Sequence, residues 1–531
     1  MKNSKKLVFL AFLTAMTVFE SCVKDIDRAP IYDISSTEVY SKFVNYQGII
    51  AKAYAGLAVT GQKGPDGNPD IRNFDEGFSS YSRMYYYMQE LTTDEAVIGW
   101  NDGSIKDLHN MNWTSGNEFV KGMYYRIFFQ VTLCNEFIRE TTDDKVSSKG
   151  FTAEENAKIK AYRAEARFLR ALSYWHAMDL FANPPFVTEN DPLGVFLPKQ
   201  TNRADLFAYV EKELKEIETL LAAPKTNEYG RADQAAAWTL LAKLYLNAEV
   251  YTGQSKATEC LTYCNKILAA GYSLEPKYEN LFKIGNDASK EVIFAIRFDG
   301  ENSKTWGGMT FLCHAPVGGT MKPADFGVSG GWSGLRTTKE FVGLFNNAAA
   351  KIDSNDTRAM FHTDGQTLDI EDIGKFTDGY AIGKFKNVDV NGKAGKDPTG
   401  THCDTDLPMF RLADVQLMYA EAVLRGGTGG TQAQALTYVN ALRQRGYKTT
   451  RPALTTIALN DILNERGREL FWENHRRTDL IRFKKFTTGD YLWQWKGNAK
   501  AGKGVADYLN VFPIPAADVV ANPTLKQNTG Y

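Results

Sequence analysis

The sequence predicts a mainly α-helical protein: a tetratricopeptide-like scaffold of paired helices with a long loop-rich region inserted between two helical blocks. Three stretches, residues 161–181, 231–251 and 412–424, place apolar residues at the i, i+3, i+4, i+7 spacing of one helix face. Residues of about 285–408 are instead rich in Gly, Asp, Thr and aromatic side chains and lack that period. This region is expected to contain a few short strands. Because it is a long loop-rich insertion on a rigid scaffold, it is also expected to carry the ligand site.

The stretch 231–251 combines the helical period with a repeat signature. Trp238, Leu241, Ala242 and Tyr245 follow the order that begins a tetratricopeptide-type repeat. The small residue in this order lets a neighbouring helix approach closely. An ordinary buried helix, the alternative, would also give one such match. The two similar stretches, 161–181 and 412–424, therefore favour stacked helix pairs with a curved, rigid face.

The bulk composition is ordinary for a globular protein with a large core. Among 531 residues, 43% are hydrophobic and 24% are charged, and the formal net charge is −1. Because no long basic run accompanies this balance, no nucleic-acid partner is expected. The aromatic share of 12% suits either a large core or a stacking surface.

The N-terminus predicts export and a lipid anchor. Three lysines precede an apolar segment, residues 7–19, that is too short to span a bilayer, and Ser21 is followed by Cys22. Residues 1–21 are therefore expected to be a lipoprotein signal peptide, with acylation of Cys22, a tether over 22–36 and one domain over 37–531. A simple secreted protein is the alternative.

The remaining five cysteines predict no disulfide framework, because their number is odd and no CxxC pair occurs. They are expected to be small buried residues. They are Cys134, Cys260, Cys264, Cys313 and Cys403.

Periodicity and turn residues place the elements in order. Helices are expected at 46–58, 119–141, 152–181, 203–221, 231–251 and 256–270. A strand over 291–298 opens the inserted region, and helices return at 412–424, 432–444, 458–472 and 476–486. The last two helices are dense in ion-pair candidates, which favour a packed structural network over catalysis. These candidates are Glu465, Arg468, Glu473, Arg476 and Arg477.

Three tryptophans outside the helical stretches are the candidate binding residues. Trp100 stands beside the turn residues Asn101, Asp102 and Gly103, while Trp306 and Trp332 lie among glycines. Glycine permits tight turns and leaves a neighbouring ring uncovered, so exposed rings are expected. A core role for Trp100 is the alternative.

No catalytic motif is supported by its context. Residues 327–331 match G-x-S-x-G, but a nucleophile elbow needs a strand before it and a helix after it, and the surroundings are glycine-rich loop. The six histidines show no metal-binding spacing. A glycosidase needs two carboxylates across a cleft, and adjacent acids such as 75–76 and 94–95 cannot both face one site.

One group of oxygen-bearing side chains raises the possibility of structural calcium. Asp404 and Asp406, together with Asn286 and Asp287, could supply oxygen ligands. Turn or capping roles are the alternative for these residues. No other metal or cofactor is expected.

Several segments together resemble the SusD/RagB family of outer-membrane lipoproteins. They are the lipoprotein cysteine, the paired helices, the loop insertion and residues 163–181, 230–251, 411–421, 464–486 and 511–515, so the resemblance covers essentially the whole chain. Residues 54–67, 75–113 and 124–144 further resemble the starch-utilisation member of this family.

This resemblance implies a non-enzymatic, lipid-anchored glycan-binding protein on the outer cell surface. It would form a lid on a SusC-type TonB-dependent transporter, with the helices as docking scaffold, near other surface glycan-binding lipoproteins. The implied ligand is starch or maltooligosaccharide, held in an aromatic arc. The calcium hypothesis also gains from the resemblance.

The resemblance also assigns the site residues. Trp100 and Trp332 match stacking tryptophans, and Trp306 stands where that site has a tyrosine. The implied polar partners are Asp75, Arg83 and Asn101. The chemistry agrees, because glucose presents apolar C–H faces to aromatic rings while its hydroxyls need directional partners. A SusD-like binder of another glycan, a glycosidase and a structural lid with buried aromatics remain the alternatives.

Overall fold

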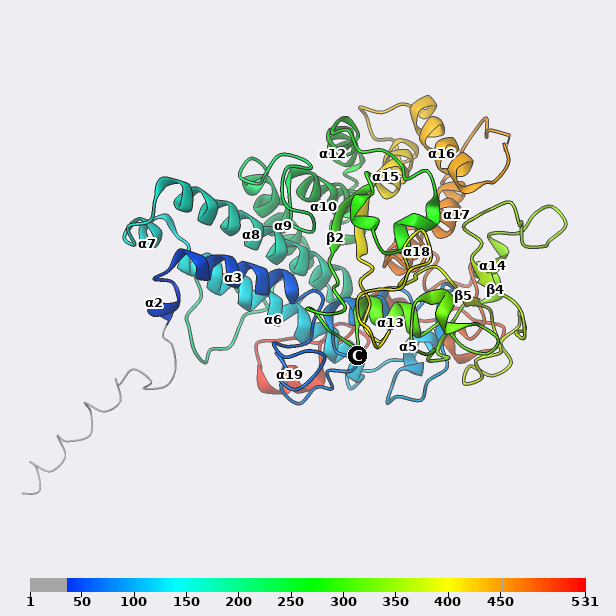
Figure 1. Cartoon of the computed structure of the whole chain (residues 1–531), viewed down its shortest axis with the longest axis horizontal. Helices are drawn as coiled ribbons and strands as arrows, with labels where there is room; N and C mark the ends of the chain where they lie inside the picture. Colours follow the sequence, from blue (N-terminus) through cyan, green and yellow to red (C-terminus); the bar gives the residue numbers. More distant parts are fainter. Residues whose placement is uncertain (1–35, 451) are drawn as a thin grey trace, which may run out of the picture.

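The computed structural model describes residues 36–450 and 452–531, and it confirms the mainly helical scaffold (Figure 1). The first helical block contains α2 (Ser36–Val39), α3 (Phe43–Ala55), α4 (Tyr81–Gln89), α5 (Lys106–Asn110), α6 (Glu118–Glu140), α7 (Asp143–Ser147), α8 (Ala153–Phe181), α9 (Arg203–Ile217), α10 (Gln234–Leu246), α11 (Ala248–Thr252) and α12 (Ala257–Ala269). The second contains α15 (Leu412–Leu424), α16 (Gln432–Gly446), α17 (Leu459–Leu470), α18 (Arg476–Arg482) and α19 (Ala516–Ala521).

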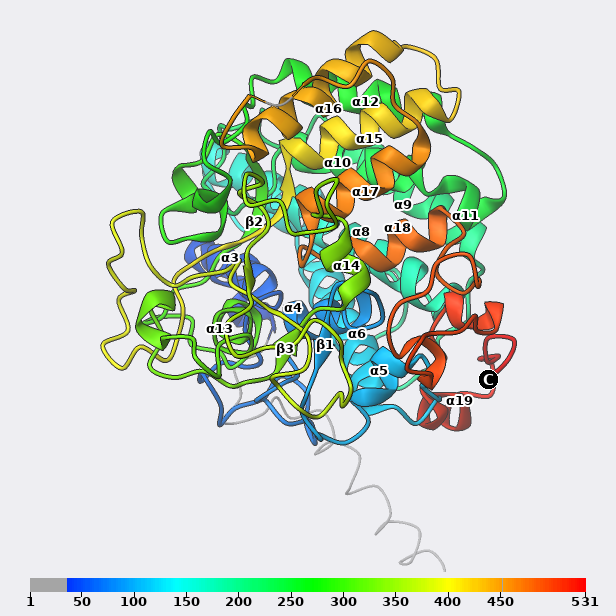
Figure 2. The ribbon, with the colours of Figure 1, turned by 90° about the vertical axis from the view of Figure 1, so that its right-hand side faces the viewer.

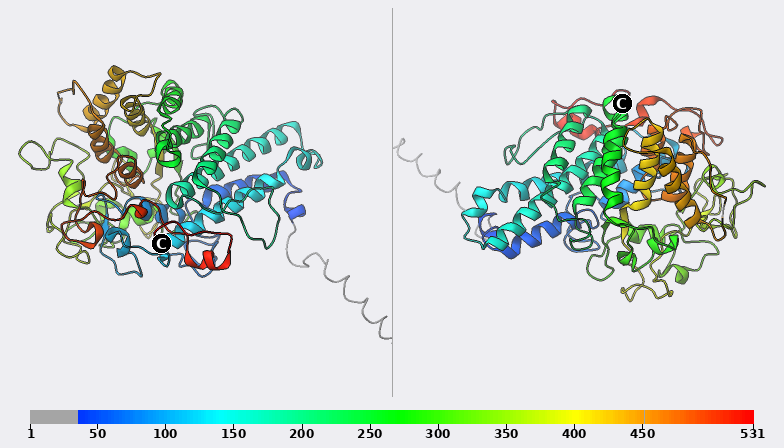
Figure 3. Two further views of the ribbon diagram at one scale, coloured as in Figure 1. Left: turned by 180° about the vertical axis from the view of Figure 1, so that it is seen from behind. Right: turned by 90° about the horizontal axis from the view of Figure 1, so that it is seen from above.

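Successive helices pack against one another, as the repeat signature predicts. Helix α8 packs on α6 and α9, α12 packs on α10 and α15, and α15 packs on α16 (Figure 2). In α10 the small Ala242 is completely buried, which allows the close approach of its neighbours. Helices α3, α6 and α8 lie side by side at one end of the molecule, as Figure 3 shows from two further directions.

The stretch predicted as one helix over 231–251 is two helices in the structure. Asp233 caps the start of α10 by accepting a hydrogen bond from the Ala236 amide at 3.0 Å. The helix ends at Asn247, whose backbone leaves the helical region and whose side chain donates to the Lys243 carbonyl at 3.0 Å. The Asn247 side chain, hydrogen-bonded to a backbone carbonyl of the preceding turn, thus ends α10 before α11 begins.

Helix α4 has no counterpart among the predicted helices. All nine of its residues are buried, so its sequence shows no polar face that would reveal a helical period. Ser80 caps its start by accepting from the Arg83 amide.

Short antiparallel ladders organise the inserted region. Its elements are β2 (Val292–Ile296), α13 (Gly308–His314), β3 (Leu335–Arg336), α14 (Lys339–Gly343), β4 (Phe361–His362), β5 (Ala381–Ile382) and β6 (Leu407–Arg411). Strand β2, which confirms the predicted strand, pairs with β6, so the insertion leaves and rejoins the scaffold at one ladder. Strand β4 pairs with β5, and β3 pairs with β1 (Val97–Ile98) from the first helical block.

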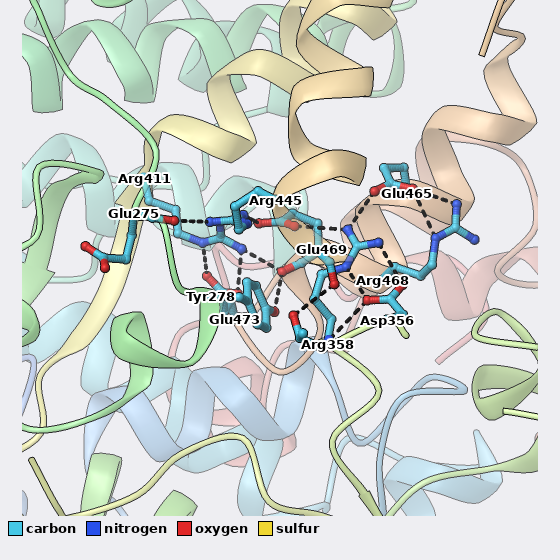
Figure 4. A network of polar contacts seen from close by, with 12 residues as sticks. Glu275, Tyr278, Asp356, Arg358, Arg411, Arg445, Glu465, Arg468, Glu469 and Glu473 are labelled. Atoms are coloured by element: carbon cyan, nitrogen blue, oxygen red, sulfur yellow. Dashed lines mark hydrogen bonds and ion pairs between the residues drawn. The ribbon is translucent and has the colours of Figure 1, made fainter. Parts of the chain in front are cut away.

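A buried network of ion pairs joins the insertion to α17, as Figure 4 shows. Arg411 at the end of β6 contacts Glu291, Glu469 and Glu473 at 2.6–2.8 Å. Arg358 contacts Glu465 at 2.6 Å and Glu469 at 3.1 Å. The expected structural role of the charged residues around α17 and α18 is therefore confirmed.

The five cysteines of the described region are free and buried, as predicted. No helix in the described part of the chain combines the length and apolar composition needed to cross a membrane. The predicted signal peptide, Cys22 and most of the tether lie outside the described residues.

Candidate functional site

The ladder between β1 and β3 brings together two tryptophans that are far apart in the sequence. Trp100 follows β1 by two residues, and Trp332 precedes β3 by three. The ladder continues past its strands, because the Gly99 amide donates to the Gly334 carbonyl at 3.0 Å. The ring centroids of Trp100 and Trp332 lie 6.1 Å apart with planes inclined at 49°.

These two indoles line one cavity of about 390 Å³. Asp75 and Arg83 line the same cavity, so four of the six predicted ligand-binding residues are brought to one place. The other lining residues are Gly77, Phe78, Tyr87, Asp102, Ile105 and Phe119. The cavity thus combines aromatic faces with carboxylate and guanidinium groups.

The indoles are half-buried, whereas exposed rings were predicted. Trp332 stacks on His314 of α13 at 4.8 Å and 22°, and Trp100 meets the Phe311 ring edge-on at 6.0 Å. Burial lowers the pKa of His314, so its ring is neutral at neutral pH. One side of each indole is therefore held by α13, which fixes the ring orientation.

Glycine allows the close packing of these rings. A Cβ at Gly334 would lie 2.5 Å from the Trp100 indole, and one at Gly331 would lie 2.1 Å from the Val317 carbonyl oxygen. The glycines beside Trp332 thus permit close backbone approach as well as turning.

Arg83 of α4 ties the cavity walls together. Its guanidinium donates to the Tyr87 hydroxyl at 2.9 Å, the Gly77 carbonyl at 2.6 Å and the Trp306 carbonyl at 3.1 Å. The same group lies 4.4 Å from the Phe311 ring centroid and 5.6 Å from that of Trp100. It therefore orders the aromatic wall and the backbone around it.

Trp306 and Asn101 are not among the residues that line this cavity. Trp306 contributes its backbone carbonyl to Arg83, and its ring lies 5.0 Å from that of His402. Asn101 is exposed, between two residues that do line the cavity. Both stand at the margin of the site.

Several residues of the site carry no distinguishing signal in the sequence. Phe78, Phe119 and Tyr87 resemble ordinary core aromatics. Tyr87 of α4 and Phe119 of α6 line the cavity because these helices pack together, and Phe78 lies in the turn before α4. The proximity of His314 and Trp332 depends on the backbone bond from the Trp332 amide to the His314 carbonyl at 2.9 Å. Asp102 could have been selected, because it follows Asn101 in the same loop.

Three of the four predicted calcium ligands are engaged in hydrogen bonds within the protein. Asp404 accepts hydrogen bonds from backbone amides, including that of Gly300 at 3.0 Å, and Asp406 accepts from the Phe298 amide at 2.8 Å. The Asn286 amide is engaged with backbone carbonyls, and Asp287 is exposed. Burial also raises the pKa of Asp406 to about 7, which disfavours the charged ligand that calcium requires.

The described residues gather no cluster of three or more His, Cys, Asp or Glu side chains that could hold a metal. The G-x-S-x-G match at 327–331 is loop in the structure, without the strand and helix that a nucleophile elbow requires. What the Trp100 and Trp332 cavity offers chemically is stacking and hydrogen bonding.

Comparison with known proteins relates the chain to one protein family. A model of the SusD family matches residues 354–531. The chain is 34% identical to the starch-binding protein SusD of Bacteroides thetaiotaomicron, over 100% of this chain and 99% of that protein. It is 23% identical to SusD-like protein P2 of Formosa agariphila, over 98% and 99% of the two chains.

Solved structures agree on the fold. A SusD superfamily protein of Bacteroides vulgatus matches with a TM-score of 0.69 at 18% identity, over 92% of this chain and 99% of that one. Surface glycan-binding protein A of Bacteroides thetaiotaomicron, solved with laminarihexaose, matches with a TM-score of 0.66 at 21% identity, over 91% and 99%.

Proposed function

The chain belongs to the SusD family and is a glycan-binding protein rather than an enzyme, and on that basis we propose that it captures starch and maltooligosaccharides. The observation that carries the proposal is the pair of inclined indoles, Trp100 and Trp332, in one cavity with Asp75 and Arg83. The full-length similarity to a protein named for starch binding supports the choice of ligand.

The ring geometry suits a curved sugar chain. Successive glucose units that stack on two rings inclined at 49° must themselves be inclined, as they are in an α-1,4 chain. Asp75 and Asp102 offer carboxylate oxygens to sugar hydroxyls. Asn101 makes no hydrogen bond within the described residues, so its amide is free for the same purpose.

Trp306 has a weaker place in this proposal. Its ring is half-buried beside His402, and only its carbonyl reaches the cavity residues, through Arg83. We assign it a contact with a sugar unit beyond the two indoles.

The setting we propose is the outer surface of the outer membrane, with a lipid on Cys22 as the anchor. The protein would form the lid of a SusC-type TonB-dependent transporter and work beside other surface glycan-binding lipoproteins. Membership of the SusD family and the lipoprotein-type N-terminus support this setting. Modest affinity per sugar, raised by many anchored copies, suits transfer of the glycan to a transporter.

The test is retardation of the soluble protein, starting after Cys22, in native gels that contain amylopectin, pullulan, xyloglucan, levan or laminarin. We expect the α-glucans amylopectin and pullulan to retard it, and Trp332→Ala to abolish the effect. Trp238→Ala is the matched control, since that half-buried indole belongs to α10 of the scaffold.

Each other outcome has a defined meaning. Retardation only by another polysaccharide would keep the glycan-binding role and reject starch. No retardation by any of them would favour a structural lid. Release of sugars from starch during an overnight digest would contradict the non-enzymatic assignment.

Structural calcium stays a separate proposal. Asn286 donates to the Asp406 backbone carbonyl at 2.9 Å, but within the described residues no three His, Cys, Asp or Glu side chains gather as metal ligands. Elemental analysis of protein purified without added salts tests it, and an absence of calcium would remove it.

A further inference from the structure

A second groove lies along α6. The segment 188–198, called the overlying segment, and Asp518 of α19 also line it. Its volume is about 700 Å³, larger than that of the Trp100 and Trp332 cavity. Five aromatic side chains line it: Tyr124, Tyr125, Phe128, Phe129 and Phe196. In Figure 1, α6 and α19 lie in the lower part of the molecule, as do α5 and α13, whereas Figure 2 shows α13 and α19 on opposite sides.

Two of these rings lie outside the hydrophobic core, and the Lys52 ammonium lies 5.9 Å from the centroid of one of them, Phe129. Phe129 of α6 and Phe196 of the overlying segment are half-buried and do not pack on the hydrophobic core. Within the described residues, neither ring stacks on another aromatic ring, whereas Phe128 packs against Tyr124 at 4.7 Å. Phe129 and Phe196 can therefore be explained neither as core nor as part of an internal aromatic cluster.

Uncommitted hydrogen-bonding groups lie beside these rings. Arg72 and Thr132 line the groove and are exposed, and neither side chain makes a hydrogen bond or ion pair with the described part of the chain. Partly exposed aromatic rings next to a guanidinium and a hydroxyl form the combination that recognises a sugar, whose C–H faces stack and whose hydroxyls need directional partners.

The overlying segment is held at both ends, so the groove is preformed. At one end, Arg139 of α6 donates to the carbonyls of Glu189 at 2.9 Å and Asp191 at 3.3 Å. At the other end, the Asn522 amide donates to the Pro198 carbonyl at 2.8 Å. A preformed groove requires little ordering when a ligand binds.

A series of ring contacts connects the two sites. Phe119, which lines the first cavity, packs on Phe78 at 5.1 Å, and Phe78 packs on Phe74 at 6.3 Å. Phe74 packs on Tyr125 of the second groove at 5.7 Å. The segment that carries Phe74 and Phe78 thus runs from one site to the other over α6.

We propose that the groove on α6 is a second carbohydrate-binding site, which takes a more distant part of the α-glucan chain held by Trp100 and Trp332. The inference rests on the proposed function and extends it from a single site to two. Two sites that bind one chain act at a high effective concentration, so long glucans benefit and short oligosaccharides do not.

The test compares Phe129→Ala and Phe196→Ala with Val195→Ala as the matched control. Val195 belongs to the same segment as Phe196, but it is fully exposed and does not line the groove. Binding to amylopectin is measured from gel retardation over a range of polysaccharide concentrations, and binding to maltoheptaose at the first site is measured by quenching of tryptophan fluorescence. Thermal unfolding of each variant checks its folding.

We expect Phe129→Ala and Phe196→Ala to weaken amylopectin binding by roughly tenfold and to leave the maltoheptaose signal unchanged. Val195→Ala should leave both unchanged. Unaltered amylopectin binding in both phenylalanine variants would overturn the second site alone, with the proposed function intact. Equal weakening by Val195→Ala would assign the effect to the segment as a whole and overturn it too. Failure of the native protein to bind any α-glucan would remove both proposals.

Discussion

At the scale of single residues, Arg83 shows how one side chain determines the geometry of a site. Its planar fork donates to three acceptors from three parts of the chain: Tyr87, Gly77 and Trp306. Lysine carries the same charge on a single nitrogen and cannot reproduce that fork. Arg83 is only 7% exposed, so bonds lost there are not fully replaced by water.

We expect Arg83→Lys to weaken amylopectin binding by about tenfold and to lower the free energy of unfolding by about 1–3 kcal/mol. Gel retardation and urea unfolding provide the two measurements. Arg297→Lys is the control, since that exposed arginine directly follows β2. The free energy of unfolding of this variant should stay within about 0.5 kcal/mol of the native value. Lower stability with unchanged binding would reduce Arg83 to a structural role.

At the scale of elements, the ion-pair network connects the insertion to the scaffold. Glu469 of α17 faces Arg411 of β6, Arg445 of α16 and Arg358 of the insertion. Burial alone would raise the pKa of Glu469, but these three cations outweigh it and hold the pKa at about 2. A buried charge in such a network depends on all of its partners.

Loss of Glu469 should therefore be costly. Glu469→Gln leaves buried guanidinium groups without full compensation, and we expect it to lower the free energy of unfolding by about 3–5 kcal/mol at pH 7 in urea titrations. Glu371→Gln is the matched control, because its pair with Lys500 is exposed and should contribute less than about 1 kcal/mol. Equal effects of the two substitutions would contradict the network's role.

Glu469→Gln should also alter how the free energy of unfolding depends on pH in the acid range. Since the pKa of Glu469 in the folded protein, about 2, lies below its usual 4.5, the ionised carboxylate stabilises the fold above pH 4.5. That contribution is lost as the pH falls from about 4.5 to about 2. The difference in the free energy of unfolding between the native protein and Glu469→Gln should therefore shrink over this pH interval.

At the scale of the whole molecule, scaffold and insertion share one core. The insertion begins at β2 and ends at β6, and these strands pair with each other. Lys384 from within the insertion pairs with Glu473, just after α17, at 2.7 Å, and both side chains are fully buried. Residues 285–408 consequently have little core that is not also the core of the helices.

We expect scaffold and insertion to unfold together, as the prediction of one domain over 37–531 implies. Calorimetry should show one transition, and tryptophan fluorescence should coincide with far-ultraviolet circular dichroism during urea unfolding. Two separated transitions, with fluorescence changing first, would instead show that the insertion around Trp306 and Trp332 unfolds independently.

The sequence by itself determined the helical scaffold. A helix forms from hydrogen bonds four residues apart and from an apolar stripe with a local period, so its information is local. Boundaries such as 203–217 in place of the predicted 203–221 differ by a few residues, and α4 was missed because it is buried on all sides. The buried cysteines and the charged cluster around Glu465 were also readable from local pattern.

The tertiary structure alone decided which candidate residues meet. Trp100 and Trp332 are brought together by the pairing of Val97 with Arg336, and no local signal in either strand of two residues specifies that register. The same folding leaves the Trp306 ring beside His402, and it directs the carboxylates of Asp404 and Asp406 to backbone amides. The groove on α6 likewise exists only because the segment 188–198 is held at both ends by contacts with residues distant in the sequence. Such long-range pairings depend on the packing of the complete core, which local periodicity does not encode.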